Sequence, residues 1–176
     1  MLSTVQFNRA WAMPDKYTFR IAPIRKLVLR YVGDGRGWAD PFSGFFSPAE
    51  FTNDLNVKTP AKDHMLAKDW AEKIEGPFKG VLFDPPYSYR QVSEHYKEAG
   101  LFAHTDDTNN YFYSSVRKAL VPKIEPGGIV ICFGWNTQGF GLNNGFELIE
   151  ILDVCHGFHH NDTLVTVERR VNGILV

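Results

Sequence analysis

The feature that most constrains the fold is a short apolar run closed by two prolines, GVLFDPPY at residues 80–87. Its first four residues form a continuous apolar run, which is typical of a central strand in a sheet buried on both faces. Pro85 and Pro86 cannot continue such a strand, because proline lacks the N–H that a central ladder needs. The strand is therefore expected to end at Asp84, within a largely parallel α/β sheet.

Other apolar runs alternate with helix-like stretches, and about seven strands are expected in all. Residues 129–133, IVICF, form a second buried run after the turn Pro126-Gly127-Gly128. Residues 146–154 and 164–170 alternate apolar with polar residues, so they are expected to pair antiparallel at an edge of the sheet. The remaining expected strands are short and lie at residues 37–40, 50–53 and 64–66.

Three helices are expected between these strands. Residues 23–32 are predicted to be helical, with Pro23 suited to the first turn and Gly33 to the end. Apolar side chains recur on one face of this helix at Ile24, Leu27, Val28 and Tyr31. Helical patterns also cover residues 90–99 and a stretch from residue 107 or 108 to about 121.

The composition is that of an ordinary globular domain, with 176 residues, 44% hydrophobic and 22% charged. This length suits one domain over residues 1–176, with residues 1–17 as an N-terminal extension. No apolar stretch reaches the roughly 18 residues of a membrane span, and the first residues lack a signal pattern, so a cytoplasmic protein is expected. Cys132 and Cys155 lie in apolar runs, where buried reduced thiols are expected rather than a disulfide.

The net charge of −1 hides an uneven distribution of charge along the chain. Residues 1–37 hold seven Lys or Arg against two Asp, while the remainder holds twelve against eighteen acids. A basic N-terminal segment is able to hold phosphates, although a solvated charged face explains the same pattern equally well. Any binding to nucleic acid is therefore expected to be modest and sensitive to salt.

Acidic residues follow four of the expected strands, at Asp40, Asp54, Asp69 and Asp84. In a parallel sheet the loops beyond the carboxyl ends of the strands meet and hold the functional residues. Four acids there fit a polyfunctional cofactor such as S-adenosylmethionine, whose ribose hydroxyls, adenine amino group and ammonium all need acceptors. Asp is also common at strand ends and helix caps, which is the structural alternative for each one alone.

The sequence Asp84-Pro85-Pro86-Tyr87 suits methylation of a planar amino group. The lone pair of an aromatic exocyclic amine is delocalised, and two acceptors aimed at its hydrogens would draw the nitrogen toward tetrahedral geometry. The Asp84 carboxylate and a carbonyl of the rigid Pro-Pro backbone supply those acceptors, and Tyr87 has an aromatic face that stacks on a base. A base in a duplex would have to be flipped out to reach this loop. A rigid strand-ending turn is the alternative.

Residues after this loop and after residue 133 are candidates for substrate contacts. Ser88, Arg90 and Gln91 follow the loop directly, where they either hold a flanking phosphate or form an ordinary helix start. Trp135 faces the same edge of the sheet by this geometry, although core packing is the commoner role for such a tryptophan.

The turn at residues 156–162 is expected to lie on the same face as Asp84. There Phe158 or His159 could stack on a base and Asn161 could hydrogen-bond a base edge, with a polar turn as the equal alternative. A zinc site is conceivable from Cys155, His156, His159 and His160. No second ligand pair with finger spacing exists, so no metal is expected.

These residues resemble the amino-methyltransferase family, whose motif (Asp/Asn/Ser)-Pro-Pro-(Tyr/Phe/Trp) marks enzymes that methylate adenine N6, cytosine N4 and other planar amino groups. The resemblance covers most of residues 18–170 and looks greatest to small bacteriophage-encoded methyltransferases regarded as specific for adenine in DNA. It implies a Rossmann-like fold: a seven-stranded, mostly parallel sheet with helices on both faces and a C-terminal antiparallel hairpin. It also implies S-adenosylmethionine as the cofactor.

The resemblance further implies which residues hold that cofactor. Asp40-Pro41-Phe42-Ser43-Gly44 looks like the family's cofactor loop, D-P-F-x-G-x-G. The segment 18–23, with Ile21 and Pro23, matches a further cofactor-binding segment. Asp54 sits where the family places the acid that binds ribose, and Asp69 where it places the acid that binds adenine.

Two departures from the family pattern bear on function. The second glycine of the cofactor loop is replaced in Gly44-Phe45-Phe46, and no separate target-recognition domain is expected in a chain of this length. Specificity is therefore expected to come from loops, from a homodimer or partner subunit, or to be low. The expected activity is methylation of adenine N6 in DNA. The alternatives are an RNA base (guanine N2 or adenine N6), a protein glutamine, or an inactive relative that binds nucleic acid or a partner.

Overall fold

The computed structural model describes residues 4–86, 110–157 and 160–171. The predicted helix at residues 90–99 lies outside the described residues. So do six of the predicted site residues: Tyr87, Ser88, Arg90, Gln91, Phe158 and His159.

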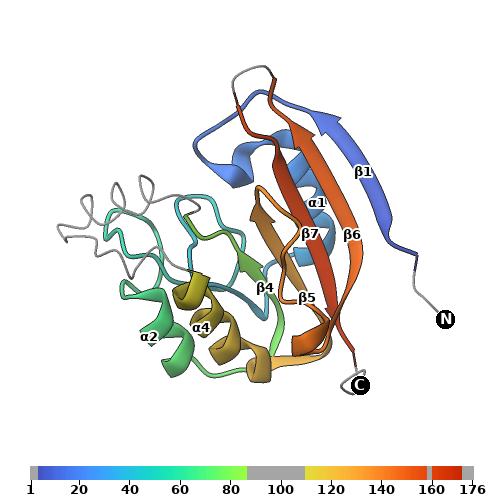
Figure 1. Cartoon of the computed structure of the whole chain (residues 1–176). Helices are drawn as coiled ribbons and strands as arrows, with labels where there is room; N and C mark the ends of the chain where they lie inside the picture. Colours follow the sequence, from blue (N-terminus) through green and yellow to red (C-terminus); the bar gives the residue numbers. More distant parts are fainter. Residues whose placement is uncertain (1–3, 87–109, 158–159, 172–176) are drawn as a thin grey trace.

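A seven-stranded sheet forms the centre of the protein, in the order β1-β6-β7-β5-β4-β2-β3 (Figure 1). The strands are β1 Gln6–Trp11, β2 Trp38–Asp40, β3 Phe51–Thr52, β4 Phe78–Phe83, β5 Ile124–Gly134, β6 Phe146–Cys155 and β7 Thr163–Arg170. Of these strands only β7 runs antiparallel to its neighbours, β5 and β6. The predicted mostly parallel sheet with a C-terminal antiparallel hairpin is confirmed.

The strand β1 occupies an edge that the sequence assigned to the hairpin. Its residues pair in parallel with β6, from Gln6 opposite Glu150 to Trp11 opposite Cys155. The placement of the β6–β7 hairpin at an edge was therefore wrong, and part of the expected N-terminal extension belongs to the sheet. Phe7 and Trp11 are 62% and 65% exposed, so β1 lacks the buried apolar face from which a strand is predicted. Its pairing with β6 is made by the backbone, which a sequence pattern does not reveal.

The predicted short strand at residues 64–66 was also wrong. The chain makes only an isolated bridge there, between Asn53 and Asp63, and then enters the helix α2, Ala67–Lys73. Ala67, Trp70 and Ala71 recur at helical spacing and are all buried, and this periodicity prevails over a short apolar run.

The helices cover both faces of the sheet, as predicted (Figure 1). Helix α1, Ala22–Val32, packs Leu27 and Val28 into one apolar cluster with β5 and β7. Helices α2 and α4, the latter Asn110–Leu120, pack Trp70 and Leu120 into a second cluster on the opposite face. Three short 3-10 helices complete the described elements: η1 Thr18–Arg20, η3 Val121–Lys123 and η4 Leu142–Asn144. Within the described ranges, no helix is both long and apolar enough to cross a membrane.

The strand β4 sits between these two clusters. Leu82 belongs to the cluster under α1, while Val81 and Phe83 belong to the cluster under α2 and α4, as the two-residue repeat of a strand requires. A Cβ at Gly80 would lie 2.6 Å from the Trp38 ring of the neighbouring strand. Gly80 is therefore required where β2 and β4 pack together.

The turn predicted at Pro126-Gly127-Gly128 lies inside β5, which begins earlier than expected, at Ile124. The register between β4 and β5 shifts between Phe78 and Gly80, so the extra residues form an irregularity in the ladder. The two cysteines are free thiols, as predicted, but only Cys132 is buried and Cys155 is half-buried.

Glu150 on β6 joins three elements through its carboxylate, which is 2% exposed. Arg30 Nη2 donates to both carboxylate oxygens at 2.7 and 2.6 Å, Tyr31 Oη donates at 2.7 Å, and Asn8 Nδ2 donates at 2.9 Å. Burial alone would raise the pKa of Glu150, but the hydrogen bonds from Arg30 and Tyr31 outweigh it and the pKa is lowered. Burial and the bond to Glu150 raise the pKa of Tyr31 to about 12. The edge strand β1 and helix α1 are thus tied to the sheet through one acid.

We predict that Glu150→Gln lowers the free energy of unfolding by about 2 to 3 kcal/mol at neutral pH, because it removes charge-assisted hydrogen bonds from a buried group. Urea unfolding measures this change. The lowered pKa means that the stabilisation is present above the ordinary glutamate pKa and is lost as pH falls through the folded one, so the difference shrinks in acid. The control is Glu72→Gln, which breaks an exposed ion pair with Lys68. That pair contributes less than about 0.5 kcal/mol to the free energy of unfolding. Equal effects of the two changes would contradict the role of Glu150.

Candidate functional site

The carboxyl ends of β2, β3 and β4 meet at one edge of the sheet and bring three predicted acids together. Asp40 is the last residue of β2, Asp54 lies two residues beyond β3, and Asp84 directly follows β4. Both Asp84 and Asp54 act electrostatically on the Asp40 carboxyl group. We call Asp40, Asp54 and Asp84 the acid edge.

Asp40 is completely buried at the centre of the acid edge. Its Oδ1 accepts a hydrogen bond from the Phe42 N–H at 3.0 Å, and its Oδ2 accepts one from Ser47 Oγ at 2.6 Å. Burial raises the pKa of Asp40 to about 7, the two hydrogen bonds oppose that rise, and the neighbouring charges of Asp84 and Asp54 add to it. Asp40 therefore exchanges a proton near neutral pH.

The loop after β2 is fastened to the end of β3. Asp54 Oδ2 accepts from the Gly44 N–H at 2.8 Å, and Asp54 Oδ1 accepts from the Asn56 N–H at 2.8 Å. The Ser43 N–H donates to the Asn53 carbonyl at 2.9 Å. These bonds give the predicted cofactor loop a fixed position beside Asp54.

Asn53 is a functional candidate that the sequence reasoning missed. It is 1% exposed, and its Nδ2 donates to the Pro41 carbonyl at 3.1 Å and to the Met65 carbonyl at 3.0 Å. Its Oδ1 accepts from the Met65 N–H at 3.1 Å. One amide thus holds the loop after β2 against the segment before α2. The available signal was its position directly after β3.

The Ser43 hydroxyl in this loop is buried, and its oxygen has no hydrogen-bond partner among the described residues. Such an orphaned group costs about 1 to 3 kcal/mol unless something else bonds to it. Apart from Gly44 and its two chain neighbours, no heavy atom of the described residues lies within 4 Å of the place where a Cβ on Gly44 would stand. The loop therefore combines an unused hydroxyl with open space beside its backbone.

Phe45 and Phe46, which depart from the family's glycine pattern, project outward from this loop. They are 40% and 48% exposed, and both pack edge-on against Tyr17 with ring centroids 5.6 and 5.0 Å away. The Arg20 guanidinium lies 5.5 Å from the Phe46 ring centre. The two phenylalanines therefore form an aromatic rim with the segment before α1.

The predicted cofactor segment before α1 lies next to this rim. Ile21 is buried and stands at the N-cap of α1, and Pro23 is in the first turn. Asp69 does not follow a strand as the sequence predicted. It lies exposed in the first turn of α2, because the buried face of that helix is formed by Ala67, Trp70 and Ala71.

The predicted catalytic loop is described as far as Pro86. Asp84 and Pro86 are half-buried and Pro85 is buried. Tyr113 Oη on α4 donates to the Pro86 carbonyl at 2.7 Å, and the Tyr113 ring packs edge-on against Phe42. Tyr113, which the sequence reasoning missed, connects the loop after β4 to the loop after β2.

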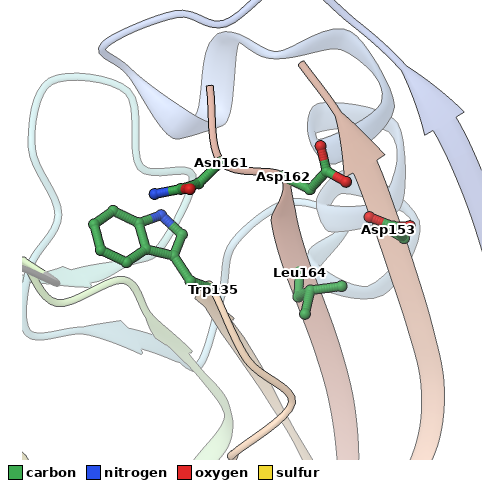
Figure 2. Close-up of a pocket in the computed structure, with 5 residues that line it drawn as sticks. All are labelled: Trp135, Asp153, Asn161, Asp162 and Leu164. Atoms are coloured by element: carbon green, nitrogen blue, oxygen red, sulfur yellow. The ribbon is translucent and has the colours of Figure 1, made fainter. Parts of the chain in front are cut away.

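Trp135 directly follows β5 and is 48% exposed, so the alternative that it packs in the core does not hold. It lines a pocket of about 380 Å³ together with Asp153, Asn161, Asp162 and Leu164 (Figure 2). The structure thus brings together two of the predicted substrate residues, Trp135 and Asn161. It adds two carboxylates that were not predicted.

The loop that carries Trp135 is held by Glu168 on β7, a further residue that the sequence reasoning missed. Its carboxylate accepts from the Phe140 N–H at 2.5 Å and from the Gly141 N–H at 3.0 Å. Burial raises the pKa of Glu168, and these two bonds oppose the rise. A Cβ on Gly139 would lie 2.1 Å from the carboxylate, so the close approach requires glycine there.

Of the residues considered for zinc, His159 lies outside the described residues. Both ring nitrogens of His156 already have protein partners, the Ala12 carbonyl at 3.0 Å and Thr163 Oγ1 at 2.8 Å. In the described ranges, possible ligand atoms gather only at Asp153, Cys155 and Asp162. Arg9 Nε lies 2.9 Å from Cys155 Sγ and 3.2 Å from Asp153 Oδ2, so the positive charge beside these ligand atoms comes from the Arg9 side chain.

The sequence matches no protein-family model, and no curated protein matches it in sequence. Solved structures are similar to it in fold. TrmN from Thermus thermophilus aligns over 86% of this chain with a TM-score of 0.56 and 15% identity, and this chain spans about half (49%) of that protein. The Burkholderia thailandensis 1,6-didemethyltoxoflavin-N1-methyltransferase, with 1,6-didemethyltoxoflavin and S-adenosylhomocysteine bound, aligns over 90% of this chain and 80% of its own, with a TM-score of 0.57 and 13% identity. The protein yhhF from Escherichia coli, a proposed methyltransferase, aligns over 90% of this chain and 88% of its own, with a TM-score of 0.53 and 11% identity.

The chain has the methyltransferase fold. In this methyltransferase fold the acid edge lies beyond the carboxyl ends of parallel strands, the position where open α/β sheets bind their ligands.

We predict that the pKa of Asp40 makes stability depend on pH in a defined direction. Because its folded pKa of about 7 lies above the ordinary value of 3.8, the folded protein holds the proton more tightly, and the free energy of unfolding falls as pH rises between these values. Asp40→Asn imitates the protonated group and is expected to reduce this fall. Urea unfolding at about pH 5 and about pH 8 measures it.

The control for this prediction is Asp34→Asn, which changes an exposed acid in the loop before β2 and is expected to leave the pH dependence as it is. An Asp40→Asn protein with the same pH dependence as the unmodified protein would contradict the assignment.

Proposed function

We propose that this protein is an S-adenosylmethionine-dependent methyltransferase that acts on an exocyclic amino group of a nucleic-acid base, adenine N6 in DNA. The observation that carries the proposal is the acid edge beside Asp84-Pro85-Pro86 in a methyltransferase fold. The motif chemistry and the family resemblance support the base and the DNA substrate.

The acid edge favours a cationic ligand. Among the described residues, neither Asp40 nor Asp54 forms an ion pair with a lysine or arginine. Both side chains are buried, and keeping uncompensated carboxylates away from water is unfavourable. S-adenosylmethionine carries an ammonium and a sulfonium, so its binding would relieve this cost.

The residues at the edge fit this cofactor. The orphaned Ser43 hydroxyl and the open space at Gly44 lie in the loop that the family resemblance assigns to it. Each oxygen of Asp54 accepts one backbone hydrogen bond and keeps a lone pair with which to accept a ribose hydroxyl. The residues proposed to hold the cofactor are Ile21, Pro23, Asp40, Pro41, Phe42, Gly44, Asp54, Asp69 and Asp84.

When bound, S-adenosylmethionine supplies an electrophilic methyl group. The role of the chain is to orient and activate the amine. The Asp84 carboxylate and the Pro85 carbonyl accept hydrogen bonds from its two N–H groups, which draws the nitrogen lone pair out of conjugation with the ring. The methylated nitrogen is a strong acid, and Asp84 accepts its proton. Tyr113 keeps the loop in place through the Pro86 carbonyl. The residues proposed to contact the substrate are Tyr87, Ser88, Arg90, Gln91, Trp135, Phe158, His159 and Asn161.

The central experiment incubates the protein with S-adenosylmethionine carrying a labelled methyl group and with single-stranded DNA, duplex DNA or RNA. Mass spectrometry of the digested product then identifies the modified base. We expect N6-methyladenine in DNA, and a loss of about 100-fold or more for Asp84→Ala with unchanged unfolding, because the variant lacks the main acceptor. Asp34→Ala is the matched control and should retain full activity.

Each other outcome overturns a defined part of the proposal. Methylated guanine N2 in RNA, or methylated glutamine in a protein, would keep the reaction and replace the substrate. Undiminished transfer by Asp84→Ala would remove Asp84 from the mechanism.

We also predict that Tyr113→Phe lowers the turnover number by about tenfold and leaves the KM for S-adenosylmethionine unchanged, because it releases the Pro86 carbonyl and with it the alignment of the acceptors. Steady-state kinetics separate the two constants. The control is Tyr31→Phe, which removes the hydrogen bond to Glu150 and costs about 1 kcal/mol of stability far from the acid edge. Equal turnover in both variants would show that Tyr113 does not position the loop.

A further inference from the structure

The pocket beside Trp135 has one aromatic wall and an acidic side. The Trp135 ring and the Asn161 amide lie close to each other, Leu164 lines the pocket between the strands, and Asp153 and Asp162 lie next to each other on the opposite side (Figure 2). Its volume of about 380 Å³ suits a single flat ring system.

One carboxylate oxygen of a residue that lines the pocket lacks a hydrogen-bond partner among the described residues. Asp153 Oδ2 pairs with Arg9 Nε at 3.2 Å, but Asp153 Oδ1 is buried and has no partner among the described residues. Asp162 adds a second carboxylate, whose Oδ1 accepts a long hydrogen bond of 3.4 Å from the His156 N–H and which also interacts electrostatically with Arg9. Carboxylates accept hydrogen bonds and repel phosphate, so the pocket calls for a group rich in N–H donors.

The pocket does not coincide with the position of the reacting amine. Neighbouring strands lie about 4.8 Å apart, and the order β6-β7-β5-β4 places the Asp153 strand three positions, roughly 14 Å, from the strand that ends at Asp84. Trp135 follows β5, which is directly beside β4. A base bound in this pocket would therefore be a different base from the one that reacts.

We propose that this pocket reads a guanine next to the methylated adenine, with Trp135 stacked on the ring and the carboxylates of Asp153 and Asp162 accepting its N1–H and N2–H groups. Guanine is the base that presents two adjacent donors on one edge, which a carboxylate accepts as a pair. Asn161, which both donates and accepts, bonds the neighbouring carbonyl of the same edge. This inference rests on the proposed function, because it assumes a nucleic-acid strand at the acid edge.

The test uses short single-stranded oligonucleotides with one adenine flanked by guanine, by inosine, or by each of the other bases. Inosine lacks only the N2 amino group and is the matched substrate. We expect guanine to give binding by fluorescence anisotropy and methyl transfer about tenfold better than inosine. In Asp153→Asn and Asp162→Asn this ratio falls toward one, and two separate positions keep the test usable if one variant fails to fold.

Two further variants distinguish recognition of guanine by the carboxylates from stacking of any base on Trp135. Asp34→Asn makes the same charge change away from the pocket and should keep the guanine preference. Trp135→Ala should weaken binding of every sequence by about tenfold, because stacking on an aromatic side chain does not depend on the base.

The outcomes distinguish the two proposals. Methyl transfer with equal rates for guanine and inosine would overturn the guanine pocket and leave the proposed function intact. Guanine-dependent binding with no methyl transfer to any substrate would overturn the proposed function and leave the pocket. A guanine preference unchanged in both Asp variants, or tight binding of Zn²⁺ alone that is lost in Asp162→Asn, would overturn the assignment of these carboxylates.

Discussion

The structure depends on the parallel alignment of β2, β3 and β4, which forces the side chains that follow these strands into one small region. Asp40, Asp54 and Asp84 belong to segments far apart in the sequence, yet all three meet there. Burial raises the pKa of Asp40 to about 7, and the neighbouring charges of Asp84 and Asp54 add to that rise. The loops around the acid edge are arranged to keep these acids in place, with Asn53 and Tyr113 fixing the backbone on either side.

Much of this arrangement could be predicted from local sequence. The run at residues 80–83 with its two prolines marks β4, the helical spacing of Ile24, Leu27 and Val28 marks α1, and the alternation near the C-terminus marks the β6–β7 hairpin. These signals are strong because the period of each helix or strand determines which of its residues are buried. The acids were found for a related reason, since the end of a parallel strand fixes the edge at which its next residue lies.

The parts that could not be predicted depend on contacts between distant segments. The strand β1 exists because its backbone pairs with β6, and its own side chains are too exposed to show a pattern. The position of Asp69 was predicted wrongly because the short apolar run at residues 64–66 suggested a strand, whereas the chain enters helix α2 at Ala67. Glu150, Glu168 and Asn53 look like ordinary polar residues in sequence, and only the folded chain shows which donors surround their oxygens.

Calorimetric titration of S-adenosylmethionine into the protein near pH 7, in two buffers with different ionisation enthalpies, measures whether the acid edge binds the cofactor and whether Asp40 loses its proton. A cation at the acid edge favours the ionised form of Asp40, so we predict binding with release of a proton, and no release in Asp40→Asn. A titration to about 1 mM cofactor detects any complex with a binding free energy of roughly −4 kcal/mol or better. The absence of binding heat at that concentration would contradict cofactor binding at the acid edge.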